Sequence, residues 1–322
     1  MNHQAELFVA LQRLLPQHAL SRLIARAAES KTPWLKNLLI KRAIAAFDIN
    51  ISEAASSDTN DYKNFNDFFT RALKDGARPM DQDSDSLISP ADGAVSQAGP
   101  ITQQRIIQAK GSDYSAARLL GNSKEAKLYE DGAFTTIYLS PKDYHRVHMP
   151  IAGSLISSRY IPGDLFSVND KTAQGLPGLF ARNERLVCQF DSELGQFALV
   201  FVGAMLVAGI ETVWGGFETP GRGAVRDADF SDRNLHFDKG EEIGRFKFGS
   251  TVILLFQKDK IDWQDWFIPQ AAVRMGEKIA SFKKQVNRAD AVLRRRKNHY
   301  SGLTDAGFVP IVRHLRRMKR AW

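Results

Sequence analysis

The sequence has little cysteine and no long apolar stretch. Cys188 is the single cysteine, so no disulfide can form within the chain. The longest uncharged run, residues 194–210, has 17 residues and is broken by glycines, as expected of buried strands and not of a bilayer span. The first residues lack the basic start and apolar core of a secretory signal. We therefore expect a chain that needs no disulfides, has no membrane-spanning segment and suits a reducing compartment.

Several cofactor and enzyme motifs are also absent. The sequence contains no P-loop and no dinucleotide fingerprint, which argues against a bound nucleotide. It has neither a His-x-x-x-His spacing nor paired cysteines, so we expect no resident metal. The Gly-x-Ser-x-Gly elbow of α/β-hydrolases is missing as well.

What is present is an ordinary globular composition with a basic end. Of the 322 residues, 43% are hydrophobic and 25% are charged, which excludes wholesale disorder and collagen-like chains. The formal net charge is +8, and residues 271–322 carry 14 basic against 3 acidic groups. Such a tail is compatible with nucleic acid, anionic lipid or only solvent as its neighbour.

The first fifty residues predict amphipathic helices. Apolar residues recur at helical spacing on both sides of Pro16, and Thr32-Pro33 has the form of a second helix start. This pattern fits helices packed on their own protein and helices lying on a membrane surface about equally well. The apolar positions are Phe8, Leu11, Leu15, Leu20, Leu23, Trp34, Leu35, Leu38 and Leu39, and the cations expected on the opposite face of the second segment are Lys36, Lys41 and Arg42.

The middle of the chain has the pattern of a β protein. A polar linker at 53–62 and a short amphipathic helix at 65–73 precede β-branched runs that are separated by Gly, Pro, Asn and Asp. These runs predict a sandwich or barrel, and after Asp262 we expect basic helix. The fold class is therefore α+β, with a helical region at 1–62, a β-rich core at 63–270 and a basic helical tail at 271–322. The expected strands lie at 134–139, 185–190, 197–202, 205–214 and 251–256.

Three places in the β-rich region concentrate reactive groups. Asp92 lies in a turn before Gly93, where aspartate is also ordinary turn chemistry. His145 and His148 follow an expected strand, where histidines are often only hydrogen-bonded. Ser250 follows Gly249 at the start of an apolar strand, which is a common and uninformative arrangement. Each signal taken alone is weak.

Taken together, the three places supply a set that can activate serine. Asp92 would orient a base, His148 would be that base and Ser250 the nucleophile. The target could be the chain itself, because the carbonyl of Gly249 is open to the neighbouring hydroxyl through a five-membered ring, and such placement is worth ~7 to 11 kcal/mol of barrier. Thr251 is a candidate to hold the oxyanion. The alternative is a serine hydrolase that uses the same residues on an external ester.

At this point the residues resemble those of a known family. The chain is similar to the bacterial-type phosphatidylserine decarboxylase proenzymes from about Trp34 to about Ala280. Several of the matching segments are long and ordered. They are Phe65–Phe69, Pro90–Gly93, Tyr138–Pro150, Pro162–Asn169, Leu179–Arg185, Val202–Ala204, Ile210–Trp214, Gly244–Lys247 and Gly249–Thr251.

The resemblance implies a self-processing enzyme. Asp92, His148 and Ser250 would form the self-cleavage relay, and the Gly249–Ser250 bond would break to give chains 1–249 and 250–322. Ser250 would become a covalent pyruvoyl cofactor. Its ketone would form a Schiff base with phosphatidylserine and accept electrons as carbon dioxide departs, giving phosphatidylethanolamine. His145 would handle the substrate carboxylate or return the proton.

The resemblance also implies a location and partners. The substrate is a membrane lipid, so we expect a peripheral protein on the cytoplasmic side of the cell membrane, with the helices of residues 1–50 on the bilayer and the basic residues of 278–297 adding attraction. The two cleavage products would stay together, a homodimer of these pairs is left open, and no nucleic acid is expected. Phe248 stands where the family usually has Leu, and the stretch after about Val286 has no counterpart in the family. A non-enzymatic binder that acts through the basic tail is the remaining alternative.

Overall fold

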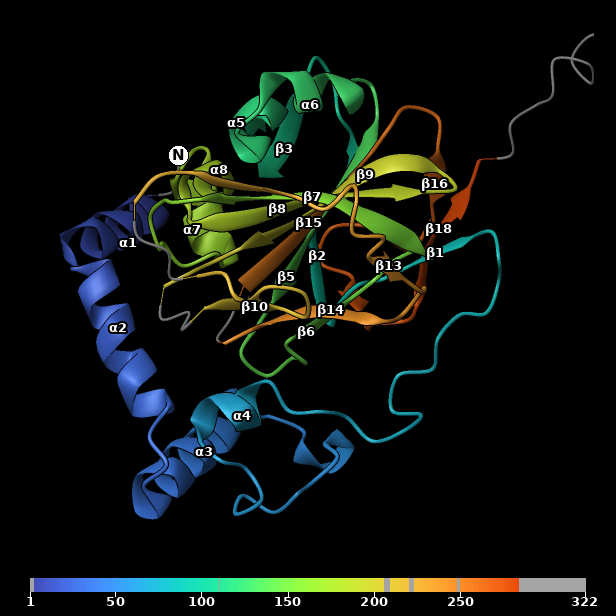
Figure 1. The fold of residues 1–322 in the computed structure, drawn as a ribbon. Coiled ribbons are helices and arrows are strands. Elements are labelled where there is room, and N and C mark those ends of the chain that lie inside the picture. Colours follow the sequence, from blue (N-terminus) through green and yellow to red (C-terminus); the bar gives the residue numbers. More distant parts are fainter. Residues whose placement is uncertain (1–2, 110, 206–208, 220–222, 248–249, 284–322) are drawn as a thin grey trace, which may run out of the picture. The chain divides into compact units, whose positions relative to one another are not determined.

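The computed structural model describes residues 3–109, 111–205, 209–219, 223–247 and 250–283. The described residues up to Phe282 form one compact unit. The fold described below is that of this unit (Figure 1).

Three helices open the chain, as the periodicity predicts. They are α1 (His3–Leu14), α2 (Gln17–Ala28) and α3 (Pro33–Phe47). Pro16 separates α1 from α2 because proline has no N–H for the helical ladder. Pro33 occupies the first turn of α3, where that N–H is not needed. Asp48 ends α3 in the left-handed conformation, with φ of 53°.

The N-terminal helices pack against different parts of the chain. α1 lies against α7 (Asp170–Gly175), where Ala5 and Val9 are buried and Gln12 Nε2 donates to Thr172 Oγ1 at 3.1 Å. α3 lies against α4 (Phe65–Phe69), the short helix expected after the linker.

The solvent-facing position expected for Lys36 is wrong. Its side chain is buried, and Nζ donates to the carbonyls of Asn60 at 3.2 Å and Tyr62 at 2.8 Å. The polar segment before α4 therefore folds back onto α3 and gives the ammonium backbone acceptors.

A large antiparallel sheet forms the centre of the β-rich part. Its order is β12-β7-β8-β9-β15-β5-β2-β17, and β13 also pairs with β7. β15 (Ser250–Phe256) is central, because it pairs along its length with β5 (Ala133–Leu139) and β9 (Gly195–Val202). The other strands are β2 (Gly93–Pro100), β7 (Gly153–Ile161), β8 (Arg185–Ser192), β12 (Arg226–Asp229), β13 (His236–Phe237) and β17 (Ala272–Val273).

Smaller sheets accompany this one. A four-stranded sheet has the order β11-β10-β14-β6, a three-stranded sheet has the order β1-β18-β16, and β3 and β4 form a hairpin. Their strands are β1 (Ser86–Ile88), β3 (Arg105–Ala109), β4 (Ser112–Ser115), β6 (Arg146–His148), β10 (Ile210–Thr212), β11 (Gly216–Phe217), β14 (Glu242–Phe246), β16 (Ile261–Trp263) and β18 (Lys278–Phe282). The remaining helices are η1 (Ile51–Glu53), α5 (Ala116–Leu120), α6 (Ser123–Leu128) and α8 (Leu179–Arg182).

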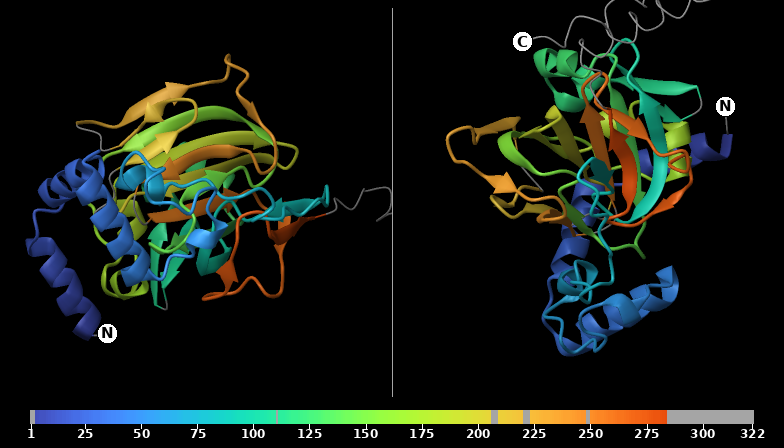
Figure 2. Two further views of the ribbon diagram at one scale, coloured as in Figure 1. Left: turned by 90° about the horizontal axis from the view of Figure 1, so that it is seen from below. Right: turned by 90° about the vertical axis from the view of Figure 1, so that its right-hand side faces the viewer.

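The two faces of the central sheet bury different clusters. Val252 and Leu254 point from β15 into a cluster shared with strands β6, β10 and β14 of the four-stranded sheet. Ile253 and Leu255 point the other way, into a cluster shared with α5, α7, α8 and the β3–β4 hairpin. The core is thus an open sandwich, since β12 and β17 end the central sheet's pairing order within the described residues. Figure 2 shows the strands in layers, with the N-terminal helices on one side of them.

The helix expected directly after Asp262 is wrong. β16 extends through Trp263, and β17 and β18 continue the chain as strands up to Phe282. β17 pairs with β2, and β18 pairs with β1 and β16, so tertiary pairing determines this segment. The rest of the predicted basic helix, from residue 284, lies outside the described residues. Among the helices that the structure describes, none is long and apolar enough to cross a bilayer.

Candidate active site

The candidate residues converge at one end of the central sheet. β2 begins at Gly93, β5 ends at Leu139 and β15 begins at Ser250. Ser250 pairs with Leu139, and Ala94 pairs with Tyr138, so the three chain segments reach the same edge. Antiparallel pairing of these neighbouring strands therefore brings the Asp92 turn, the histidine-bearing loop and Ser250 to one place.

Ser250 has an uncommon environment for a hydroxyl. Its side chain is completely buried, and Oγ has no hydrogen-bond partner among the described residues. Alternation along β15 places it on the same face as Val252 and places Thr251 on the face of Ile253. The side chains of Ser250 and Thr251 therefore point to opposite faces of β15, and the oxyanion role of Thr251 stays a prediction.

Gly249 and Phe248 lie outside the described residues. The described chain leaves β14 through Lys247 and resumes at Ser250. Just before this break, Phe246 N–H donates to the carbonyl of His145 at 2.9 Å. The predicted cleavage site is therefore close in sequence to a residue held against the histidine-bearing loop.

His148 is placed as a neutral base. Its backbone N–H donates to Pro90 O at 2.8 Å, which joins β6 to the Asp92 turn. Ring Nδ1 lies 2.8 Å from the carbonyl of Gly240, and because a carbonyl only accepts, Nδ1 carries the proton. Nε2 then has the lone pair, which accepts from Tyr144 Oη at 3.1 Å. Burial lowers the pKa of His148, so the ring is neutral at physiological pH.

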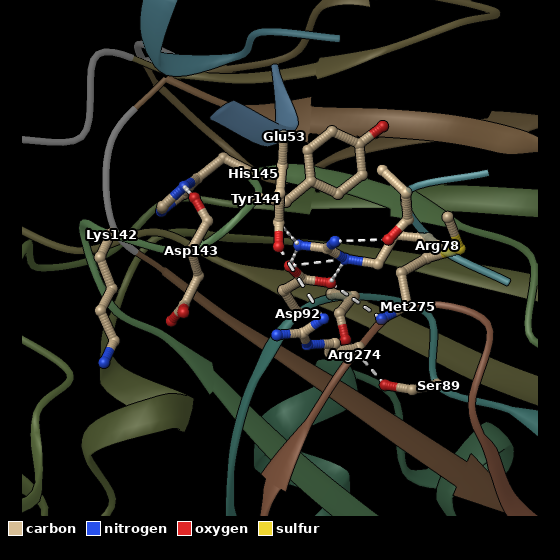
Figure 3. Close-up of polar contacts among 12 residues, drawn as sticks. Glu53, Arg78, Ser89, Asp92, Lys142, Asp143, Tyr144, His145, Arg274 and Met275 are labelled. Carbon is tan, nitrogen blue, oxygen red and sulfur yellow. Dashed lines mark hydrogen bonds and ion pairs between the residues drawn. The ribbon is translucent and has the colours of Figure 1, made fainter. Parts of the chain in front are cut away.

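Asp92 is held by an arginine. Arg78 Nε donates to both carboxylate oxygens at 2.9 and 3.0 Å, and Nη2 lies 2.5 Å from Oδ2. The backbone N–H of Met275 adds a bond of 2.9 Å to Oδ1 (Figure 3). Asp92 makes no hydrogen bond to His148 within the described chain. Burial lowers the pKa of that ring, and the charge of Asp92 partly opposes this effect. In the predicted relay Asp92 would accept from Nδ1 of His148 and so orient the ring, but here the carbonyl of Gly240 is that acceptor.

Sequence reasoning missed Arg78. It also pairs with Glu53 at 2.8 Å and donates to Ala77 O at 2.7 Å, so all three of its side-chain nitrogens are bonded. Burial lowers its pKa, but the hydrogen bonds and charges of Asp92 and Glu53 outweigh this effect and raise it. A single arginine in a polar loop has no periodicity or motif that would reveal this role.

His145 is a second neutral histidine with an unused lone pair. The side chain is fully buried, with its ring centroid 4.1 Å from that of Phe69. Nδ1 donates to the carbonyl of Asp143 at 2.8 Å, which fixes the tautomer and leaves the lone pair on Nε2. Nε2 has no partner among the described residues. Burial lowers the pKa of His145 to about 3.

Two cavities adjoin this region, and both contact Tyr138. The polar pocket has a volume of 530 Å³ and contains Asp92 and Tyr144. The apolar pocket has a volume of 540 Å³ and lies between α1, the end of α3 and nearby loops. The polar pocket is also lined by Asp48, Glu53, Arg71, Arg78, Ser140, Lys142, Asp143, Asp170 and Arg274, and the apolar pocket by Phe8, Leu11, Leu15, Phe47, Pro141, Val168 and Met205.

Comparison with known proteins identifies the family. The family model for phosphatidylserine decarboxylase matches residues 65–281, and a second model, described as PSD, matches residues 7–48. The chain belongs to the phosphatidylserine decarboxylase family. The phosphatidylserine decarboxylase proenzyme of Acinetobacter baumannii is 51% identical over 274 residues, which cover 85% of this chain and 95% of the relative.

Other relatives carry the same name. The phosphatidylserine decarboxylase proenzyme of Stutzerimonas stutzeri is 51% identical, covering 85% of this chain and 93% of the relative. That of a Shewanella species is 52% identical, covering 87% and 98%. The main family match includes Asp92, His145, His148 and Ser250 and ends at residue 281, so it leaves out most of the predicted basic tail. Within the described residues, no cluster of His, Cys, Asp and Glu side chains has the form of a metal site.

Proposed function

We propose that this member of the phosphatidylserine decarboxylase family cleaves itself at Gly249–Ser250 and converts phosphatidylserine to phosphatidylethanolamine and carbon dioxide. The observation that carries the proposal is the buried Ser250 hydroxyl, which has no partner within the described residues, at the strand edge shared with the histidine loop. A buried hydroxyl normally has a hydrogen-bond partner. The hydroxyls of Tyr114, Thr136 and Thr251 also have none among the described residues, but that of Ser250 belongs to the residue that follows Gly249 at the predicted cleavage site.

Self-cleavage begins at the serine hydroxyl. Ser250 Oγ attacks the carbonyl carbon of Gly249, and the acyl group moves from nitrogen to oxygen. His148 Nε2 is the base, and its bond to Tyr144 must open for it to accept the serine proton. Elimination of the ester leaves a carboxylate on Gly249, and uptake of water with release of ammonia converts residue 250 to a pyruvoyl group. Asp92 supports this step through its charge and through the turn bonded to β6.

The fold supports retention of both products. After cleavage, residue 250 would be the N-terminus of the shorter chain, 250–322. β15 has partners on both sides, with Ser250 opposite Leu139 and Thr251 opposite Val202. The hydrogen bonds between β15 and these two strands would hold the new terminus in place after the peptide bond is cut.

His145 is proposed to carry the proton during turnover. A pyruvoyl group at residue 250 supplies a ketone that takes up electrons as carbon dioxide leaves. The Nε2 lone pair of His145 receives a proton from the substrate amine and returns it to the carbon that has lost carbon dioxide. The Asp143 carbonyl keeps this tautomer, and burial keeps the ring neutral until it takes the proton.

Exposed apolar residues support attachment to a membrane surface, and we propose that this surface is the cytoplasmic face of the cell membrane. On α1, Leu7, Leu11 and Leu14 are 64%, 55% and 82% exposed and lie at helical spacing on one side. Trp34 on α3 is 69% exposed. Soluble surfaces rarely gather so many large apolar side chains, whereas interfacial helices do. We propose that residues 1–62 contact the bilayer, that the β-rich core, which β17 and β18 extend to Phe282, carries the chemistry and that the basic residues of 278–297 add electrostatic attraction.

The test compares wild type with Ser250→Ala and His145→Ala. Wild type should give two pieces on denaturing electrophoresis, with the smaller one blocked to Edman degradation. Ser250→Ala should remain one uncut, inactive chain, and His145→Ala should be cut normally but turn over poorly. An intact wild-type chain that hydrolyses esters and is labelled at Ser250 by a fluorophosphonate would instead identify a serine hydrolase.

A further inference from the structure

Arg71 is a buried cation without an acidic partner in the described part of the chain. The residue is 4% exposed, lies just after α4 and lines the polar pocket. Nη2 donates to the carbonyl of Lys142 at 3.2 Å, while Nε and Nη1 have no acceptor among the described residues. Burial lowers the pKa of Arg71, and the charges of Asp92 and Asp143 only partly oppose this, because neither carboxylate is within ion-pair distance in the described structure.

Other buried arginines differ from Arg71 in this respect. All three side-chain nitrogens of Arg78 are bonded, mainly to Asp92 and Glu53. Arg185, also buried, donates from Nε, Nη1 and Nη2 to three backbone carbonyls at 2.7, 2.8 and 2.7 Å. The fold therefore satisfies buried guanidinium groups where they serve structure, and Arg71 is an exception.

The unpaired charge is costly to the folded chain. Burial lowers the pKa of Arg71, which shows that its environment disfavours the charged form. The ring of Phe68, 5.5 Å away, gives only a weak cation–π contact. An apolar side chain of similar length would fill the space without this cost. The cost is offset if an anion enters the pocket and accepts the free N–H groups.

We propose that Arg71 binds the phosphodiester of the phosphatidylserine headgroup; this proposal rests on the function proposed above. The headgroup has two anions, the carboxylate and the phosphodiester. A guanidinium bound to the carboxylate would stabilise the negative charge of the bound substrate more than that of the transition state, in which this charge is being lost, and so would oppose decarboxylation. The phosphodiester keeps its charge in substrate and product, so binding it orients the reacting carbon without hindering the reaction.

The other cations lining the polar pocket are less suited to this role. Arg78 is already held by Asp92, and Arg274 lies 3.9 Å from Glu53 with a side chain that is 60% exposed. Lys142 is exposed. Arg71 is also held on the loop that carries the proposed proton carrier, because it donates to the carbonyl of Lys142 while His145 donates to that of Asp143. Burial lowers the pKa of His145, and the charge of Arg71 lowers it further.

The test measures binding to the uncut Ser250→Ala chain, so it depends on neither cleavage nor turnover. Glycerophosphocholine supplies a phosphodiester without a carboxylate or a reactive amine, and L-serine supplies a carboxylate without a phosphate. Measured by calorimetry, the added substitution Arg71→Gln should weaken glycerophosphocholine binding by about tenfold and leave L-serine binding unchanged. The affinity of Arg71→Lys for glycerophosphocholine should lie between that of the Arg71 chain and that of Arg71→Gln. Arg105→Gln, which removes an exposed cation on β3, is the control for loss of charge.

Each other outcome counts against the proposal. Weaker L-serine binding with unchanged glycerophosphocholine binding would assign Arg71 to the carboxylate, and no change in either would remove it from the site. Folding is checked with Arg71→Met, which should raise the urea midpoint because it removes an unpaired buried charge; a lower midpoint would make Arg71 structural. Absence of decarboxylation by wild type would sink the proposed function and would be seen separately from these binding results.

Discussion

Replacing Arg78 tests how Asp92 is held. Both side chains of this ion pair are 7% exposed, so neither charge is well hydrated. Removing one partner of a buried pair typically costs about 3–5 kcal/mol because the other charge is left uncompensated. Asp92 would retain the Met275 N–H, so we expect Arg78→Met to lower the free energy of unfolding by about 3 kcal/mol, near the lower end of that range.

A double-mutant cycle isolates the pair. Asp92→Asn should cost about 2 kcal/mol, and the double variant Arg78→Met/Asp92→Asn should cost about 2 kcal/mol less than the sum of the single variants. Urea denaturation followed by tryptophan fluorescence in the Ser250→Ala background measures these values on one continuous chain. Arg105→Met is the matched control, because Arg105 and its partner Asp113 are 49% and 46% exposed, so its loss should cost about 1 kcal/mol or less.

The cycle also links stability to processing. In the cleavable background, Arg78→Met should slow self-cleavage, because Asp92 would lose the groups that fix its position. Additive single variants, with coupling under about 0.5 kcal/mol, would show that the ion pair does not hold Asp92. Unchanged cleavage with the expected coupling would confine Arg78 to stability.

Three further predictions follow from the same structure. An unfolded histidine takes up a proton near pH 6.5, whereas the pKa of folded His145 is about 3, so acid favours the unfolded state. The uncut chain should therefore lose about 2 kcal/mol of stability between about pH 7 and pH 5. An equally steep loss in His145→Phe would contradict this. Gly93→Ala should destabilise by on the order of 3 kcal/mol, since the new Cβ would lie 2.3 Å from Tyr138 O at a φ of +156°. Gly76→Ala, with φ of +74° and open space, should cost only about 1 kcal/mol, and equal costs would refute the steric argument. Leu11→Glu should weaken flotation with anionic vesicles. Leu128→Glu, at an apolar position on α6 that is 42% exposed against 55% for Leu11, should not, and equal binding by both would exclude α1 as the contact.

The sequence predicts much of the fold because its local patterns are strong. Helical spacing interrupted by Pro16 gives α1 and α2, and β-branched runs give β5, β8, β9 and β15. The prediction of helix at 271–282 is wrong because the strands there are short and depend on pairing with β1 and β2. The prediction that Lys36 faces solvent is wrong because the carbonyls that accept its hydrogen bonds belong to the linker, and no helical pattern reveals the path of that segment.

The candidate site is predicted less completely than the fold. Convergence of Asp92, His148 and Ser250 at one sheet edge follows the expectation, but the contacts between them do not. The orienting acceptor of His148 is the carbonyl of Gly240, and a backbone carbonyl has no side-chain signature in the sequence. Arg71 and Arg78 differ only in whether an acid lies within reach, which depends on long-range folding.

The most direct measurement is the intact mass of the purified wild-type chains. Self-cleavage predicts two species, 1–249 and 250–322, with the smaller one lighter than its encoded sequence by the mass difference between an N-terminal serine and a pyruvoyl group. A catalytically active preparation that contains a single chain, with an unmodified serine joined to Gly249, would contradict the account.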